Sequence, residues 1–164
     1  MAPVKTFAVT RTYDVSPGRL LDVLLDPAFL AEKAQRFGGA GAPTVQRGAG
    51  TATVEMPRQL PMDQIPSAAR SFVPAGGRVV QKESWLLGDT GAEASWEVDT
   101  GSPASVRGTH RVTAAGTGSW HEIAGAAKVG VPFVGGRLEG LIAEHLEKLC
   151  QAEADFAAEW LARG

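Results

Sequence analysis

The stretch from Pro132 to Arg163 constrains the fold most, because its sequence is compatible with one uninterrupted helix. A cluster of helix breakers, Val131 to Gly136, precedes it, and beyond that cluster there is no proline and only Gly140 before the terminal glycine. At 1.5 Å per residue, such a helix is roughly 40 Å long, enough to cross a small domain. We therefore expect a C-terminal helix that begins near Gly135.

The same stretch has the periodicity of an amphipathic helix. Apolar residues recur at spacings of three and four, and a histidine and an alanine fall on the same stripe: Leu138, Leu141, Ile142, Leu149, Phe156, Trp160, His145 and Ala152. The pattern assigns polar residues to the other faces: Glu139, Glu144, Glu147, Lys148, Gln151, Glu153 and Glu159. An apolar face of this length needs a broad apolar partner.

The rest of the chain is predicted to form an antiparallel sheet. Alternating or β-branched runs separated by short glycine turns fall at 4–13, 43–46, 51–56, 78–87, 92–99, 105–114 and 120–131. Short connections favour antiparallel hairpins. After the first run, Ser16-Pro17 and Asp26-Pro27 are helix-start signals and predict two short helices, the second ending at Gly38-Gly39. The region from Pro57 to Pro74 holds four prolines and several apolar residues, and we interpret it as a loop or lid.

These elements predict an α+β fold: a six- to seven-stranded antiparallel sheet wrapped around a long C-terminal helix, with two short helices after strand 1. A length of 164 residues indicates one domain, 1–164. With 16 basic and 18 acidic residues and no basic patch, nucleic acid is not an expected partner. The sequence also lacks a signal-peptide core, an apolar membrane span and a second cysteine, which predicts a cytoplasmic protein without stable membrane insertion.

Four polar residues are predicted to share the covered side of the sheet. Strand parity places Glu83, His110 and His121 on the inner face, and helical spacing places His145 opposite them. Buried polar groups cost about 1–3 kcal/mol unless they have partners. The four can bond to one another as a hydrogen-bonded core, or they can anchor the head group of a ligand. They come from four elements without metal-binding spacing, so neither a metal nor another cofactor is expected.

Small residues at Ala94, Gly108, Gly125 and Ala127 predict either a close approach of the helix to the sheet or an open space beneath it. If it exists, bulky residues and the few polar ones would wall it. The candidate ligand-binding residues are therefore Phe7, Val9, Val54, Glu83, Trp85, Trp96, His110, His121, Ile123, Leu141 and His145. No catalytic residue is assigned.

The chain resembles the START-like superfamily, also called SRPBCC or Bet v 1-like, and within it the bacterial family of unknown function number 2505. The resemblance covers nearly the whole chain. It is carried chiefly by the run Val129-Gly130-Val131-Pro132-Phe133-Val134-Gly135-Gly136-Arg137-Leu138-Glu139, with Glu83-Ser84-Trp85 and Gly108-Thr109. It implies a helix-grip fold and, in many members, an apolar ligand held between the sheet and the long helix. The superfamily also contains lipid carriers, cyclases and co-chaperone-like proteins, so fold does not fix function.

Three hypotheses follow. The first is a non-enzymatic binder of a small hydrophobic or lipid-like molecule. The second is a cyclase- or hydrolase-like enzyme with Glu83 or a histidine as acid or base. The third is an interaction module with a filled core. The presence of a cavity separates the third from the others, and the sequence does not predict the oligomeric state.

Overall fold

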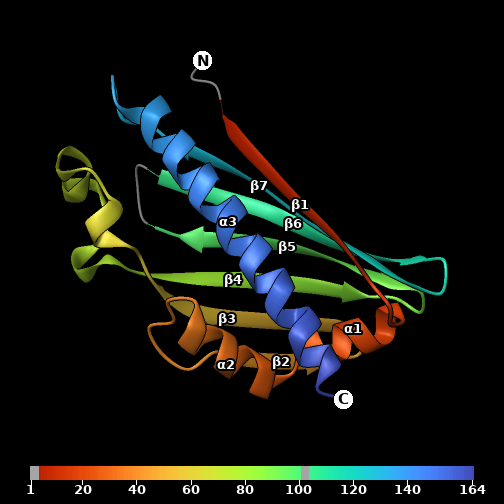
Figure 1. The fold of residues 1–164 in the computed structure, drawn as a ribbon. Helices are drawn as coiled ribbons and strands as arrows, with labels where there is room; N and C mark the ends of the chain where they lie inside the picture. Colours follow the sequence, from red (N-terminus) through yellow and green to blue (C-terminus); the bar gives the residue numbers. More distant parts are fainter. Residues whose placement is uncertain (1–3, 101–103) are drawn as a thin grey trace.

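The computed structural model describes residues 4–100 and 104–164, without the side chains of residues 68, 69, 72 and 75. Seven antiparallel strands form one sheet in the order β1-β7-β6-β5-β4-β3-β2. The strands are β1 (Lys5–Tyr13), β2 (Thr44–Gly48), β3 (Thr51–Gln59), β4 (Arg78–Leu87), β5 (Gly91–Asp99), β6 (Ala104–Ala115) and β7 (Gly118–Val129). Helix α3 (Gly135–Ala162) lies diagonally across one face of the sheet (Figure 1). The helix-grip prediction is confirmed.

The two short helices, α1 (Pro17–Leu24) and α2 (Pro27–Arg36), pack beside the C-terminal half of α3 (Figure 1). Both start as the sequence predicts. Ser16 Oγ accepts a hydrogen bond from the Arg19 N–H at 3.2 Å, and Asp26 Oδ1 accepts one from the Ala28 N–H at 2.9 Å. These side chains satisfy backbone donors that an uncapped first turn would leave free.

Strand β3 continues through a proline, although the sequence pattern predicts a break at Pro57. The Pro57 carbonyl accepts the Ala40 N–H at 3.0 Å on the side away from β4. Because N and O of one residue point to the same side of a strand, the missing N–H of Pro57 removes no bond to β4. Pairing with β4 therefore runs on through Arg58 to Gln59.

Three short 3₁₀ turns, η1 (Met62–Gln64), η2 (Ser67–Phe72) and η3 (Ala75–Gly77), connect β3 to β4. We call residues 60–77 the lid. Its two ends are tied together, because the Leu60 N–H donates to the Gly77 carbonyl at 2.8 Å and Gln59 Nε2 donates to the Gly76 carbonyl at 2.7 Å. The lid projects beside the N-terminal half of α3 (Figure 1).

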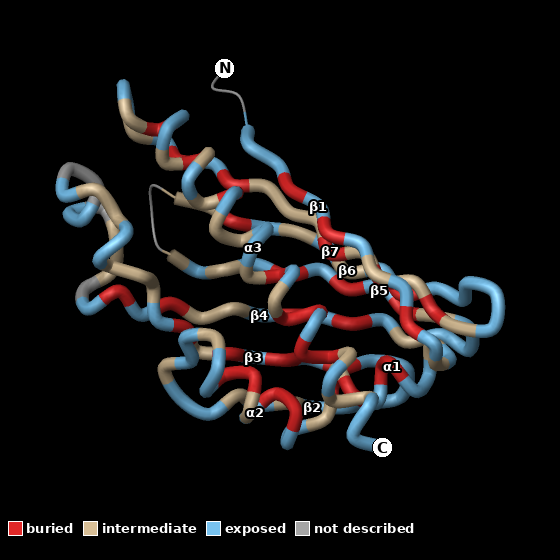
Figure 2. The backbone as a smooth tube through the Cα atoms, in the orientation of Figure 1, coloured by how far each residue is buried: buried red, intermediate tan, exposed pale blue. Residues whose placement is uncertain are grey.

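The buried face of α3 is narrower than the sequence pattern suggests (Figure 2). Most of the side chains on this face are also smaller than those of the predicted stripe. The buried residues of α3 are Gly135, Glu139, Ala143, Cys150, Glu153, Ala154, Phe156 and Ala157. The expectation that Glu139 and Glu153 lie on faces away from the covered stripe is wrong, because both are buried, whereas Leu141 of the stripe is 41% exposed. Among the described residues, no helix combines the length and the apolar character needed to cross a membrane.

Two glycines at the start of α3 have opposite steric surroundings, which gives a first prediction. A Cβ on Gly135 would lie 2.5 Å from the Val129 carbonyl oxygen, whereas one on Gly140 would meet no atom within 4 Å. Gly140→Ala should therefore raise the free energy of unfolding by about 1 kcal/mol through helix propensity. Gly135→Ala should lower it, and urea unfolding of both variants measures the difference. Equal shifts in one direction would contradict the placement of this helix end.

Candidate functional site

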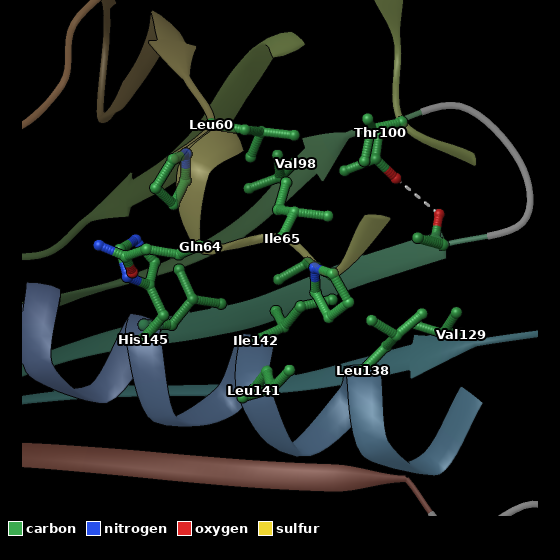
Figure 3. A pocket seen from close by; sticks show the side chains of 16 residues that line it. Leu60, Gln64, Ile65, Val98, Thr100, Val129, Leu138, Leu141, Ile142 and His145 are labelled. Carbon is green, nitrogen blue, oxygen red and sulfur yellow. Dashed lines mark hydrogen bonds between the residues drawn. The ribbon is translucent and has the colours of Figure 1, made fainter. Parts of the chain in front are cut away.

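A cavity of about 230 Å³ lies between the lid, one end of the sheet and the first half of α3 (Figure 3). Strands β5, β6 and β7 contribute Val98, Val106 and Val129, which point inward because of strand alternation. The other lining residues come from the lid, the β5–β6 connection, the first residue of β6 and α3: Leu60, Pro61, Gln64, Ile65, Pro66, Val73, Thr100, Ala104, Leu138, Leu141, Ile142, His145 and Leu146. The wall is therefore almost entirely aliphatic.

Three side chains bring polar atoms to this wall. Thr100 Oγ1 donates to the Ala104 carbonyl at 2.7 Å. Among the described residues, the side chains of Gln64 and His145 make no hydrogen bond, and both are labelled at one end of the cavity in Figure 3. Burial lowers the pKa of His145, and the positive charges of Arg58 and Lys148 lower it further. The imidazole is therefore neutral at pH 7 and can donate one hydrogen bond and accept another.

The cavity volume sets the size of a molecule that fits. A dry apolar cavity of about 150 Å³ holds a benzene molecule. The volume here is about 230 Å³, roughly one and a half times larger, so it suits on the order of ten non-hydrogen atoms. A longer chain would have to extend past the lid into solvent.

A separate polar cluster lies under the C-terminal half of α3, and it contains Glu83. Its Oε1 accepts a hydrogen bond from Trp85 Nε1 at 3.1 Å, and its Oε2 accepts one from Gln81 Nε2 at 3.4 Å. His110 Nε2 lies 3.8 Å from Glu83 Oε2, and His110 Nδ1 lies 3.0 Å from His121 Nε2. The three rings of Trp85, His110 and His121 stack in sequence.

Both histidines of this cluster are held in the neutral form. Burial lowers the pKa of His110 to about 3, with a further contribution from the Lys33 charge. Burial likewise lowers the pKa of His121 to about 3, helped by His110 and Lys33 and opposed by Glu83. In the 3.0 Å contact one ring nitrogen then donates and the other accepts. Hydrogen bonds therefore join Gln81 and Trp85 to Glu83, and His110 to His121, whereas His110 and Glu83 are in contact at a distance too long for a hydrogen bond.

Next to this chain is a buried ion cluster that the sequence reasoning missed. Arg58 Nη2 lies 2.7 Å from Glu153 Oε1, and Lys33 Nζ lies 3.5 Å from Glu153 Oε2. Arg58 Nε also donates to Gln81 Oε1 at 2.9 Å, which joins the ions to the Glu83 chain. Burial alone would raise the pKa of Glu153, but Arg58 and Lys33 outweigh it and hold the pKa below its usual range. Two cations and two carboxylates therefore balance in the core.

The space beside these polar groups is about 20 Å³, which is room for about one water molecule. Its walls include Lys33, Glu83, His110, His121 and Glu153, and it shares no lining residue with the larger cavity. The polar cluster and the apolar cavity are therefore two different sites beneath the same helix.

The predicted ligand-binding residues separate into three groups. Two of them, Leu141 and His145, line the larger cavity. Five line the water-sized space: Glu83, Trp85, His110, His121 and Ile123. The other four are packed in the hydrophobic core: Phe7, Val9, Val54 and Trp96. Of the four polar groups expected to face one space, three come together and His145 lies apart.

The small residues of the sheet make room for aromatic rings. A Cβ on Gly125 would lie 2.7 Å from the rings of both Phe7 and Trp96, and one on Gly108 would collide with Trp96. The ring centroids of Phe7 and Trp96 are 6.1 Å apart. These rings fill the space over the glycines, and Ala127 is fully buried beside them. The open space expected at this position lies nearer the end of the sheet, under the lid.

Comparison with known proteins identifies the family of this chain and structures with the same fold. The sequence matches the family described as Protein of unknown function (DUF2505) over residues 8–161. None of the curated proteins matches the chain.

Three solved structures that resemble this chain have 15% sequence identity to it or less. At this level of identity, the similarity indicates a shared fold only. TTHA0849 from Thermus thermophilus is 15% identical, with a TM-score of 0.61 over 94% of this chain and 95% of that one. Ara h 8.0201 is 12% identical, with a TM-score of 0.57 over 99% and 100%. The di-domain ARO/CYC BexL from the BE-7585A biosynthetic pathway is 12% identical, with a TM-score of 0.61 over 95% of this chain and 49% of that one.

These neighbours have the helix-grip fold of the START-like superfamily, and the family match spans nearly the whole sequence. The resemblance read from the Val129–Glu139 junction is thereby confirmed. This chain belongs to the DUF2505 family.

Proposed function

We propose that this chain binds a small, mostly apolar molecule of about ten non-hydrogen atoms in the cavity under the lid. The observation that carries the proposal is the aliphatic wall, which combines few polar groups with three converging elements: the sheet, the lid and α3. Pockets of this composition are typical of small-molecule sites. The fold is one in which ligand binding is common, which adds general support but does not identify the ligand.

The geometry favours binding over catalysis. An acid or base must come within about 3 Å of the proton that it transfers. Glu83, His110 and His121 instead surround a space for about one water and share no wall with the cavity. His145 is the one histidine at the cavity, and it lacks a carboxylate partner among the described residues. We therefore place His145 and Gln64 as hydrogen-bonding partners for one polar end of the ligand.

Decanoic acid tests the proposal by isothermal titration calorimetry, because its twelve non-hydrogen atoms suit the volume. At about 0.5 kcal/mol per atom, the dissociation constant should be on the order of 10 to 100 µM. Leu138→Trp places an indole in the cavity from a half-exposed helix position and should weaken binding at least about tenfold. Hexadecanoic acid should bind with no greater affinity, since its extra carbons lie outside.

Leu86→Trp is the matched control, because Leu86 is 67% exposed on the outer face of β4 and lines none of the cavity. This variant should bind decanoic acid as the wild type does. If neither decanoic acid nor shorter alkanoic acids bind the wild type, the filled-core interaction hypothesis replaces this one. If Leu138→Trp binds as well as Leu86→Trp, the ligand site lies elsewhere.

A further inference from the structure

The connection between β7 and α3 holds an apolar side chain in an unfavourable conformation. Phe133 has a φ of +70°, and it is the one non-glycine residue with a positive φ among those that the structure describes. The Val134 N–H donates to the Pro132 carbonyl at 2.9 Å, which closes a three-residue γ-turn around Phe133. The left-handed form of this turn is rare and strained, and glycine would adopt it without cost.

The Phe133 side chain is also fully exposed, with a relative exposure of 107%. Its ring therefore packs on nothing in the described part of the chain, and the fold gains no stability from it. Backbone strain at a position that contributes no packing points to a role outside folding. The connection lies at the N-terminal end of α3, at one end of the molecule (Figure 1, Figure 2).

Phe133 has apolar and basic residues near it in the sequence on both sides. Leu138 and Leu141 are partly exposed, and both line the cavity. Between residues 128 and 141 the exposed charged side chains are Lys128 and Arg137, and neither has an ion-pair partner among the described residues.

The acidic residue of the same stretch does not offset these charges at the surface. Glu139 is fully buried, and its Oε2 accepts the Val129 N–H at 2.9 Å. In the lid, the exposed residues Asp63 and Arg70 carry opposite charges. The exposed charged side chains of the 128–141 stretch are therefore both positive, although the whole chain carries a formal net charge of −2.

We propose that this end of the molecule, where β7 leads into α3 and which carries Phe133, Leu138, Leu141, Lys128 and Arg137, docks on an anionic phospholipid bilayer. Phe133 enters the boundary between head groups and acyl chains, and the two cations approach the lipid phosphates. Aromatic insertion combined with basic residues is the chemistry of peripheral membrane binding. The docking rests on these exposed residues and not on the proposed ligand, although it would bring the cavity to a surface where apolar molecules gather.

The size of the surface favours a bilayer over a second copy of the chain. A stable protein interface buries about 800 Å² on each partner. One phenylalanine contributes about 150–250 Å², and Leu138 is only partly exposed. A bilayer requires no matching surface, so a single inserted ring with nearby cations is sufficient for reversible binding.

Vesicle co-sedimentation tests the docking, with vesicles of phosphatidylcholine alone or mixed with phosphatidylglycerol. The wild type should bind the mixed vesicles, and raised salt should weaken the binding. Phe133→Gly should reduce the partition coefficient about ten- to a hundredfold, because the buried ring is lost. Arg137→Gln should reduce it roughly fivefold.

Two features of these variants keep the test clear. Phe133→Gly relieves the positive φ, so its thermal melt should be at or above that of the wild type. Leu86→Ser removes another exposed large apolar side chain, far from this end on β4, and should bind vesicles as the wild type does.

Equal vesicle binding by the wild type and Phe133→Gly would overturn the proposal, as would no binding by the wild type. A wild-type dimer in sedimentation velocity that Phe133→Gly converts to a monomer would assign the surface to a second copy instead. Decanoic acid binding in solution is measured separately and should be the same in Phe133→Gly as in the wild type. Failure of ligand binding and failure of docking are therefore distinguishable.

Discussion

A chain truncated after Leu149 should not fold cooperatively. The deletion removes Phe156, which is 1% exposed and stacks on Phe29 with ring centroids 5.2 Å apart. It also removes Trp160, whose ring meets Phe29 edge-on at 5.6 Å. Removing a buried aromatic side chain costs about 3–5 kcal/mol.

The same deletion takes away Glu153 and leaves two buried cations without their carboxylate. Arg58 and Lys33 are both at least nine-tenths buried, and breaking such a pair costs about 3–5 kcal/mol. The combined loss is comparable to the free energy of unfolding of a typical domain, which is about 5–15 kcal/mol. Circular dichroism should therefore show no thermal transition.

Truncation after Ala162 is the matched control, because it removes only the last two residues. The ion pair between Arg163 and Glu32 is exposed, so its loss should change the free energy of unfolding by less than about 1 kcal/mol. A cooperative melt of the shorter chain near the full-length midpoint would show that the end of α3 is dispensable for folding.

The fold could be predicted from the sequence because several local signals agree. Ser16-Pro17 and Asp26-Pro27 set the starts of α1 and α2, and the structure shows both caps. Strand alternation correctly put Glu83, Trp85 and His121 on the buried face. The absence of breakers after Gly136 correctly predicted one helix from Gly135 to Ala162.

The buried face of α3 could not be predicted in the same way. Hydrophobicity favours Leu138, Leu141 and Leu149 as the contact residues, but bulky aromatic residues from the sheet already fill the interior. Small side chains such as Ala143 and Ala154 therefore face the sheet, and the helix is rotated relative to the leucine stripe. Glu153 is buried because its charge partners lie in α2 and β3, far away in sequence.

One sequence signal for the buried ions was available. Arg58 continues the alternation of Ala52, Val54 and Met56, which are all buried. Reading Pro57 as a strand break ended that alternation too early. The position of the cavity was harder to predict from the sequence, because its wall combines residues from strand ends, the lid and α3. The sequence pattern does not show which of these aliphatic residues enclose an empty space.

We expect the protein to lose stability as the pH falls from about 6 to 4. The pKa of His110 and of His121 is lowered to about 3 in the folded chain, from 6.5 in the unfolded chain. Between these values the unfolded chain binds protons that the folded chain does not. Stability therefore decreases as the pH falls through this window.

The charged groups around the two histidines determine how far their pKa values are lowered and therefore how much stability is lost. Lys33 on α2 opposes a positive imidazole, whereas Glu83 on β4 and Glu153 on α3 favour one. Glu153 acts in a lower window. Its pKa is held below the usual carboxyl value, so its contribution is present above that value and is lost as the pH falls through its folded pKa. On acidification the histidines of the unfolded chain therefore take up protons before its Glu153 carboxylate does.

The expected slope is about 1.4 kcal/mol per pH unit for each histidine, or on the order of 5 kcal/mol for both over two units. That loss is comparable to the whole stability of many domains, so acid unfolding should begin well above the pKa of ordinary carboxyl groups. Urea unfolding at several pH values measures the slope, and side-chain nitrogen spectra of the histidines report whether both rings stay neutral in the folded state.

His121→Gln should reduce the slope by about half, whatever it does to the absolute stability. His145→Gln should leave most of the slope, since His145 lies apart at the cavity. A free energy of unfolding that stays constant between pH 7 and 4.5, or a folded-state titration of both rings near pH 6.5, would show that water reaches the Glu83–His110–His121 chain and that the core beneath α3 is not closed.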